Sequence, residues 1–458
     1  MVLLLIYLLS YIFYYSNKKA EFLLCIIALT CSGFGFLSSQ GLPFKISDLI
    51  IIEVVYITIN ERIKDRKYFN SKNDVFGKIF ITILLYYLFE FIRTVVFKID
   101  TPIYAFKVVR YITVLFFYFY LRKISYSTFE KLFHYLLVCS VAQGIFFYLQ
   151  LFGIQGILTG RIDEAEKTGQ ITRYANFPVF SLFFTIYYVV KEKGNIFFRL
   201  FMIVFFAVMP VIGQTRSAII SPAIAIIAYF IIKRKIKYSI YIALGAIFFQ
   251  LVVNPMFEYR DRHREKSTVD EIITIINNPT EAYNTYTSER NAGTFAFRIA
   301  MLVERSNYLA DNPKCIPFGT GCIHEESPNN RFTFKLGTRN SRLERGFTMI
   351  GGADISWINI LLLYGIGGIF LYTLLLYKWF KQYLSFVKDS INYLFISCLL
   401  YSITAFFLSF NSGYLVMPST LIYIQIFMAI VYIYSKRELL NKGYVQDSKN
   451  GINENHSY

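Results

Sequence analysis

The sequence predicts an all-α polytopic membrane protein with about 12 to 13 transmembrane helices and one large extracytoplasmic loop between the late helices. Two observations predict this class. Hydrophobic residues make up 55% of the 458-residue chain and charged residues only 17%, and the mean hydropathy is +0.45. In addition, apolar runs of about 18 to 22 residues, long enough to cross a bilayer, recur along the chain.

The formal net charge of +17 comes mainly from the connectors between the apolar runs. Lysines and arginines gather in alternate short connectors, where the positive-inside rule places them in cytoplasmic loops. We therefore expect the lipid bilayer, and no nucleic acid, as a partner. The basic connectors lie near residues 18–19, 62–67, 122–123, 191–193, 233–237, 378–381 and 436–437.

Hydropathy divides the chain into four parts. These are transmembrane helices 1 to 10 in residues 1–253, an extracytoplasmic loop or cap in 254–352, transmembrane helices 11 to 13 in 353–434, and a cytoplasmic tail in 435–458. The spans are expected near residues 1–16, 20–39, 46–60, 75–97, 103–121, 132–153, 175–190, 196–213, 214–232, 238–253, 353–377, 391–410 and 417–434. The first run lacks a basic start and a cleavage site, so it reads as a short span rather than a signal peptide.

The odd number of spans places the N-terminus outside and the polar tail, which we expect to be disordered, inside. Two polar segments, residues 154–174 and 254–352, then lie outside the membrane. The second is too long for a simple connector and contains two helical patterns, TVDEIITIIN and FAFRIAMLVERSNYLAD. We expect it to fold as a small cap on the helix bundle.

Arg216 is expected at the outer end of its span. The stretch GQTRS surrounds it with Gln214, Thr215 and Ser217, polar side chains that can line a wet cavity. The alternative is an arginine that extends to the outer lipid headgroups.

Three more arginines are expected on the same side of the membrane. Arg173 precedes the span at 175–190, and Arg298 and Arg305 lie two helical turns apart on one face of the predicted cap helix. The alternative for Arg305 is structural pairing with its neighbour Glu304. Because guanidinium groups match phosphate oxygens in bidentate fashion, this set of arginines indicates a diphosphate site at the outer headgroup level.

Asp354 lies where the long loop re-enters the membrane. A carboxylate there is costly unless it is paired or needed, and it can accept a proton from a sugar hydroxyl. The alternative is a helix N-cap, since Asp354 precedes an apolar helical run.

The sequence GTGC at 319–322 is followed by His324, which is a candidate base, metal ligand or substrate-binding residue. It lacks the spacing of a metal site, and GTGC is not a phosphate loop because no GK[ST] follows. Cys315 and Cys322 lie outside the apolar runs, where an oxidising compartment would allow a disulfide between them.

The order of these features resembles the O-antigen polymerase and O-antigen ligase superfamily. The resemblance covers residues 170–375. Its elements are Arg173 with Pro178, the sequence TRSA that opens a later span, Arg298 in the large loop with NP and GTG after it, and Asp354 before LLLYGIGG.

The resemblance implies a multi-pass enzyme of the bacterial cytoplasmic membrane that transfers a glycan from an undecaprenyl-diphosphate carrier to a sugar hydroxyl. It implies no nucleotide sugar, metal or other cofactor. Arg216 and Arg298 would hold the diphosphate, Arg173 would assist, and flippase and chain-length regulator proteins are possible partners. Ligases commonly carry a histidine where this chain has Asp354. That departure favours a polymerase of capsule, O-antigen or exopolysaccharide repeat units.

Two alternatives stay open. One, from the same superfamily, is an O-antigen ligase-type transferase. The other, from a different class, is a lipid-linked oligosaccharide flippase, which also combines many spans with cationic residues. A transporter places its polar residues near the bilayer midplane, often in related halves. Here the polar residues are expected at one face, which favours the enzyme.

Overall fold

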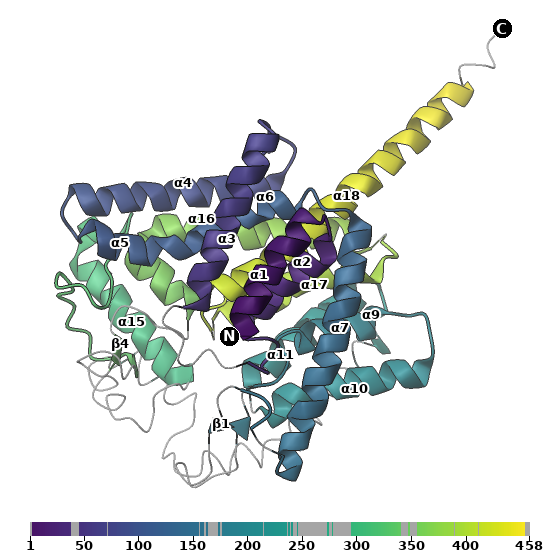
Figure 1. The fold of residues 1–458 in the computed structure, drawn as a ribbon, viewed down its shortest axis with the longest axis horizontal. Coiled ribbons are helices and arrows are strands. Elements are labelled where there is room, and N and C mark those ends of the chain that lie inside the picture. Colours follow the sequence, from purple (N-terminus) through teal and green to yellow (C-terminus); the bar gives the residue numbers. More distant parts are fainter. Residues whose placement is uncertain are drawn as a thin grey trace.

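The computed structural model is helical, and the part of the chain that it describes contains five helical segments that are long and apolar enough to cross a membrane (Figure 1). These are Val75–Val96, Pro102–Leu121, Tyr126–Phe152, Ser356–Phe386 and Pro418–Glu438. The structure describes residues 2–37, 45–70, 72–154, 156–159, 162–163, 173–174, 176–213, 215–235, 237–238, 240, 245, 273, 277, 295–339, 347–348, 355–388, 390–410 and 412–453. The class of helical membrane protein follows from these apolar helices.

The described elements follow one another in this order: α1 (Val2–Tyr15), α2 (Lys19–Thr30), α3 (Ile46–Lys64), α4 (Val75–Val96), α5 (Pro102–Val109), η1 (Arg110–Phe116), α6 (Phe117–Leu121), α7 (Tyr126–Leu149), η2 (Gln150–Phe152), β1 (Ile162–Asp163), β2 (Arg173–Tyr174), α9 (Ser181–Val190), α10 (Ile196–Ile212), α11 (Arg216–Ile232), α15 (Phe295–Asp311), η4 (Pro313–Cys315), β3 (Thr338–Arg339), β4 (Phe347–Thr348), α16 (Ser356–Phe386), α17 (Tyr393–Ser409) and α18 (Pro418–Asn453). The strands form two short antiparallel pairs, β1 with β2 and β3 with β4.

Several helices begin at a polar residue whose side chain caps the first turn. Asp74 accepts a hydrogen bond from Gly77 N at 2.9 Å and so opens α4. Asn195 and Asn392 cap α10 and α17 in the same way, with acceptor distances of 2.9 and 3.0 Å. These caps satisfy backbone donors that the helix itself leaves unpaired, and they fix where each apolar helix begins.

Some apolar helices are shorter than the predicted spans. The span expected at 20–39 ends as a helix at Thr30, because Ser32, Gly33, Phe34 and Gly35 all adopt positive φ. The span expected from residue 175 begins as a helix only at Ser181. Most of the span expected at 238–253, and most of the cap helix expected at TVDEIITIIN, lie outside the described residues.

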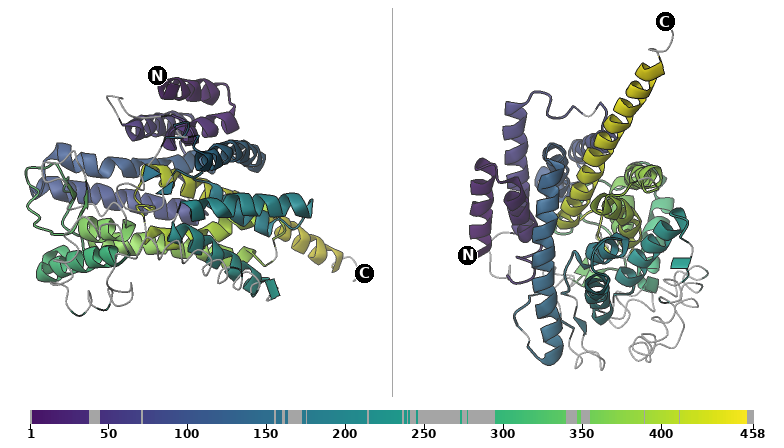
Figure 2. Two further views of the ribbon diagram at one scale, coloured as in Figure 1. Left: turned by 90° about the horizontal axis from the view of Figure 1, so that it is seen from below. Right: turned by 90° about the vertical axis from the view of Figure 1, so that its right-hand side faces the viewer.

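The C-terminal helix is much longer than the sequence predicted. We expected a disordered tail after residue 434, but α18 continues to Asn453, so that expectation is wrong for residues 435–453. The tail sequence has no proline, and near its start lie the good helix formers Lys436, Arg437, Glu438, Leu439 and Leu440. Figures 1 and 2 show this helix in yellow, projecting beyond the other helices.

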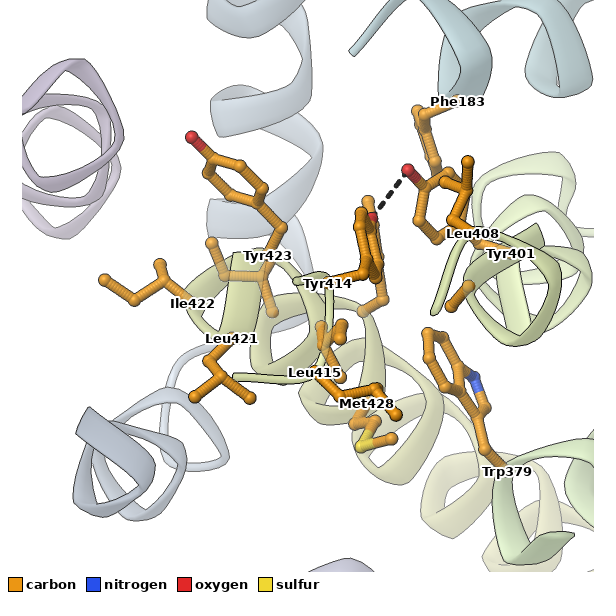
Figure 3. Packing of buried hydrophobic residues seen from close by; sticks show 14 of the residues in the cluster. Phe183, Trp379, Tyr401, Leu408, Tyr414, Leu415, Leu421, Ile422, Tyr423 and Met428 are labelled. Atoms are coloured by element: carbon orange, nitrogen blue, oxygen red, sulfur yellow. Dashed lines mark hydrogen bonds between the residues drawn. The ribbon is translucent and has the colours of Figure 1, made fainter. Parts of the chain in front are cut away.

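Aromatic and aliphatic side chains fill the core where α9, α16, α17 and α18 meet (Figure 3). Phe183 and Phe427 stack with ring centroids 4.9 Å apart and planes at 9°. The Tyr414 hydroxyl donates to the Tyr401 hydroxyl at 2.8 Å, so two buried phenols satisfy each other. Trp379 is fully buried in the same region. This core holds α16 in place, and α16 carries the site described next.

Candidate functional site

Helix α16 is interrupted at Gly365, which has φ 61° and ψ −158° within an otherwise helical segment. The break frees backbone groups that the helix would otherwise pair. Residues 316–321, which follow η4, dock into the break with four backbone hydrogen bonds. They join Thr320 N to Leu362 O (2.8 Å), Gly321 N to Leu363 O (3.2 Å), Ile366 N to Ile316 O (3.0 Å) and Gly367 N to Pro317 O (3.1 Å). Non-helical backbone inside a membrane protein needs such internal partners.

Two glycines allow this docking. Gly319 has φ +67°, and a Cβ there would lie 2.4 Å from the carbonyl carbon of Leu363. A Cβ on Gly365 would lie 2.4 Å from the backbone nitrogen of Gly319. Each glycine thus permits both a left-handed backbone and direct contact between the two segments.

Helix α4 holds the docked segment from the other side. Arg93 Nη2 donates to Phe318 O at 2.9 Å and to Gly319 O at 3.2 Å. The same guanidinium pairs at 2.7 Å with Glu90, whose side chain is fully buried. One helical turn after Glu90, Thr94 Oγ1 accepts a hydrogen bond from Cys322 N at 2.9 Å. The ion pair and the hydroxyl therefore fix residues 318–322 on α4.

Asp100, just beyond α4, anchors the next residues. It is 2% exposed and accepts hydrogen bonds from Thr101 N (2.7 Å), His324 N (3.1 Å) and Ser327 Oγ (2.5 Å). Three donors compensate for burying this carboxyl group. As a result His324 is held in a defined place against α5.

The His324 ring stacks on Tyr104, with centroids 5.8 Å apart, and its Nδ1 accepts a hydrogen bond from Glu326 N at 3.2 Å. Burial lowers the pKa of His324, which favours the neutral ring. With Nδ1 as the acceptor, the proton of the neutral ring lies on Nε2, so His324 is a hydrogen-bond donor in this arrangement. The Lys107 ammonium, 3.1 Å from Glu326, lowers the pKa of that carboxyl.

A cavity of about 230 Å³ lies beside His324. Its walls come from α4, α5, η1, residues 323–325, α16 and the turn before α18. The lining residues are Tyr87, Val108, Tyr111, Ile112, Ile323, His324, Glu325, Asn359, Leu363, Tyr364, Tyr372 and Val416. The 3₁₀ segment η1, which carries Tyr111 and Ile112, interrupts the helical span Pro102–Leu121 at this wall.

The structure pairs Arg305 within the protein. Its side chain is fully buried, contacts the Glu304 carboxylate and the Leu336 carbonyl, and lies over the Phe334 ring with 4.4 Å between Cζ and the centroid. Glu304 in turn accepts a hydrogen bond from Lys335 N at 2.7 Å. This is the structural pairing that the sequence offered as the alternative to substrate binding.

Replacing Arg305 with alanine should therefore lower stability. The change leaves the Glu304 carboxylate buried without its charge partner, and breaking such a pair costs about 3–5 kcal/mol. Thermal unfolding of the purified variant in detergent measures this loss. Arg331→Ala is the matched control, an arginine on the same polypeptide segment whose side chain is exposed. Equal melting temperatures for the two variants would contradict the structural role.

The predicted site residues form two groups. Arg298, Arg305 and His324 belong to one unit, in which α15 packs on α16 and residues 316–327 dock on α4 and α16. In the other group, α11 begins at Arg216, and a Cβ on the preceding Gly213 would lie 2.9 Å from Tyr174 O. The turn before Arg216 thus packs on β2, which contains Arg173. The side chains of Arg173 and Arg216 lie outside the described residues.

Asp354 itself also lies outside the described residues. Helix α16 begins at Ser356 and its N-cap residue is Ile355, which makes no side-chain capping bond. The N-cap position suggested for Asp354 is therefore taken by its neighbour.

Cys315 and Cys322 are free thiols, so the disulfide between them is absent. Cys322 is fully buried against α4, held there by the bond from its nitrogen to Thr94. Among the described residues, no group of three or more His, Cys, Asp or Glu side chains is placed to hold a metal ion.

Sequence reasoning missed Glu90, Arg93 and Asp100, which anchor the docked segment. A signal was present. Glu90 and Arg93 are a charged i, i+3 pair inside an otherwise apolar run, YYLFEFIRTVV, and charges within a span indicate a specific partner.

No family model matches this sequence, and no curated protein matches it.

Proposed function

We propose that this protein is a multi-pass polymerase of undecaprenyl-diphosphate-linked oligosaccharide repeat units in the bacterial cytoplasmic membrane. Its product would be a capsule, an O-antigen or an exopolysaccharide. The observation that carries the proposal is the packing of the turn before Arg216 on the strand that contains Arg173. Tyr174, the neighbour of Arg173, thereby contacts Gly213, which lies three residues before Arg216.

The environment of Arg216 also suits a diphosphate. As the first residue of α11 it lies at a helix N-terminus, where the unpaired backbone N–H groups and the helix dipole favour negative charge. The guanidinium of an arginine remains charged at any physiological pH and can bind two phosphate oxygens at once. On the expected topology, this end of α11 faces outward, where the diphosphate of a translocated lipid carrier lies.

The transfer we propose is a single displacement. The acceptor hydroxyl oxygen bonds to the anomeric carbon of the donor glycan while the bond from that carbon to the diphosphate oxygen breaks. The bonding electrons leave with the undecaprenyl diphosphate, whose charge the arginines stabilise in the transition state. The hydroxyl proton passes to Asp354, two residues before α16 begins. Arg298 would add to the positive charge around the leaving group.

Deletion of the gene tests this function against the transporter alternative. A strain without the polymerase should still export and display single repeat units, and the wild-type gene should restore long chains. Gel separation of surface polysaccharide measures both outcomes. Loss of all surface glycan, with lipid-linked repeat units accumulating on the cytoplasmic side, would instead identify a flippase.

A further inference from the structure

A glutamate is buried between the first three helices. Glu53 lies in α3, and its side chain is fully buried where α1, α2 and α3 meet. Its Oε1 is in hydrogen-bond contact with the hydroxyl group of Ser10 in α1, which is also fully buried. An ionisable side chain inside an expected membrane span is costly to keep there and indicates a specific role. The transfer reaction proposed above does not use this carboxyl group.

The contacts of Ser10 indicate that Glu53 carries a proton. The Ser10 hydroxyl has a single proton to donate, and the Tyr7 carbonyl oxygen lies 2.6 Å away as an acceptor. A Glu53 carboxylate would have to share that proton. A protonated Glu53 instead donates its own proton to Ser10 Oγ, so both contacts become complete hydrogen bonds. Glu53 Oε2 has no hydrogen-bond partner among the described residues, and a neutral acid loses less than a carboxylate when one oxygen is buried unpaired.

The groups around the carboxyl also favour the neutral acid. Among the described residues, the titratable groups that interact with Glu53 are uncharged at physiological pH, namely Tyr7, Tyr11 and Cys25. The elements η1 and α6 also pack on α3, where their titratable groups have other partners. Arg110 pairs with Asp48, Tyr111 accepts a bond from Arg110, Tyr118 bonds to Asp74 and Tyr120 faces Glu61. A charge on Glu53 would therefore meet phenols and a thiol.

Polar contacts hold α1 on α3. Two residues of α1, Leu3 and Ser10, are buried, and Figure 2 shows the helix at the outer edge of the molecule. Besides Ser10, the Tyr14 hydroxyl joins the two helices, since it donates to Glu61 at 2.7 Å and accepts from Asn60 at 2.8 Å. Because α1 buries so few side chains, its attachment to α3 depends strongly on these bonds.

We propose that Glu53 is a proton-binding site that holds α1 against α3. With the proton bound, the acid donates to Ser10 and the two helices stay together. When the proton passes to water, the carboxylate needs solvent, and α1 has to separate from α3 to admit it. The attachment is therefore present below the titration range of Glu53 and is lost as the pH rises through that range.

Infrared spectroscopy of the purified protein tests which form Glu53 takes. At neutral pH, the difference spectrum between the wild type and Glu53→Gln should show a carboxylic-acid carbonyl band that shifts in deuterated water. Glu61→Gln is the matched control on the same helix, because Glu61 also bonds to α1 but pairs with Lys64 at 3.0 Å. Its difference spectrum should show carboxylate bands. Carboxylate bands in both difference spectra would overturn the proposal.

Hydrogen exchange measured by mass spectrometry tests the attachment of α1. As the pH is raised, the amides of α1 in the wild type should exchange about tenfold faster or more than those in Glu53→Gln at the same pH, the smallest effect expected of a buried unpaired charge. Glutamine stays uncharged and can donate an N–H to Ser10 as the acid does. The amides of α7 should exchange alike in both proteins. Equal exchange of α1 in the two proteins at every pH would contradict its attachment by Glu53.

The wild type alone provides a check that does not depend on the folding of a variant. Its carboxylic-acid band should disappear as the pH rises, and the protection of α1 should fall over the same pH range. An acid band that persists after α1 has lost its protection would show that the proton does not hold the helix. Neither measurement involves polymerisation, so the result is independent of what the deletion strain shows about the proposed function.

Discussion

Gly319→Ala or Gly365→Ala should leave little folded protein. At both positions the new methyl group would overlap backbone atoms of the other segment, at 2.4 Å from Leu363 C for Gly319 and from Gly319 N for Gly365. Backbone atoms cannot move aside as flexible side chains do, so residues 316–321 would have to leave the break in α16. The four backbone hydrogen bonds that bridge the break would then be lost. We expect a cost on the order of 4 kcal/mol or more, a large part of the stability of a typical protein.

Gly153→Ala is the matched control for these variants. Gly153 also has a positive φ, +85°, but no atom of the described residues lies within 4 Å of the position that its Cβ would occupy. Alanine there costs only the left-handed backbone strain, about 1–2 kcal/mol. Thermal unfolding in detergent and the yield of monodisperse protein measure the difference. Similar melting shifts in all three variants would show that the docking contributes nothing beyond backbone strain.

Replacing Arg216 by lysine or alanine should stop polymerisation while export continues. Lysine keeps the charge but loses the planar fork that binds two phosphate oxygens, so Arg216→Lys should restore little of the polymerisation. Removing one donor that stabilises a developing charge typically lowers turnover by about 100-fold to 1,000-fold. In a deletion strain that carries either variant, the surface should hold single repeat units.

Arg234→Lys is the matched control, because Arg234 is an exposed residue just beyond the other end of α11. Surface polysaccharide length is read on gels after the membrane levels of the variants have been matched. Long chains in both Arg216 variants would identify Arg216 as a headgroup anchor, which is the alternative its sequence position allowed.

Hydropathy predicted the position of many helices well. The span expected at 75–97 is α4 (Val75–Val96), the span expected at 196–213 is α10 (Ile196–Ile212), and the cap helix expected at FAFRIAMLVERSNYLAD is α15 (Phe295–Asp311). These elements follow from periodicity and composition, which are local properties of the sequence. The pairing of Arg305 with Glu304 could also be predicted from the sequence, since the two residues are adjacent.

The docked segment could not be predicted in this way. Glycines within an apolar run such as LLLYGIGG are typical of close helix packing, but nothing local to them specifies that Gly365 breaks the helix and receives residues 316–321. The partners of Asp100, such as His324 and Ser327, lie more than 200 positions away in the chain. Such contacts depend on the tertiary fold, so a single sequence reveals the charged residues without showing what they hold.

Reconstitution of the purified protein tests the central claim most directly. Proteoliposomes would receive only an undecaprenyl-diphosphate-linked repeat unit, without nucleotide sugar or added metal. We predict a ladder of lengthened lipid-linked glycans and one undecaprenyl diphosphate released for each unit added, with both products reduced by Arg216→Lys. Repeat units that cross the bilayer without lengthening, and without release of undecaprenyl diphosphate, would contradict the polymerase assignment.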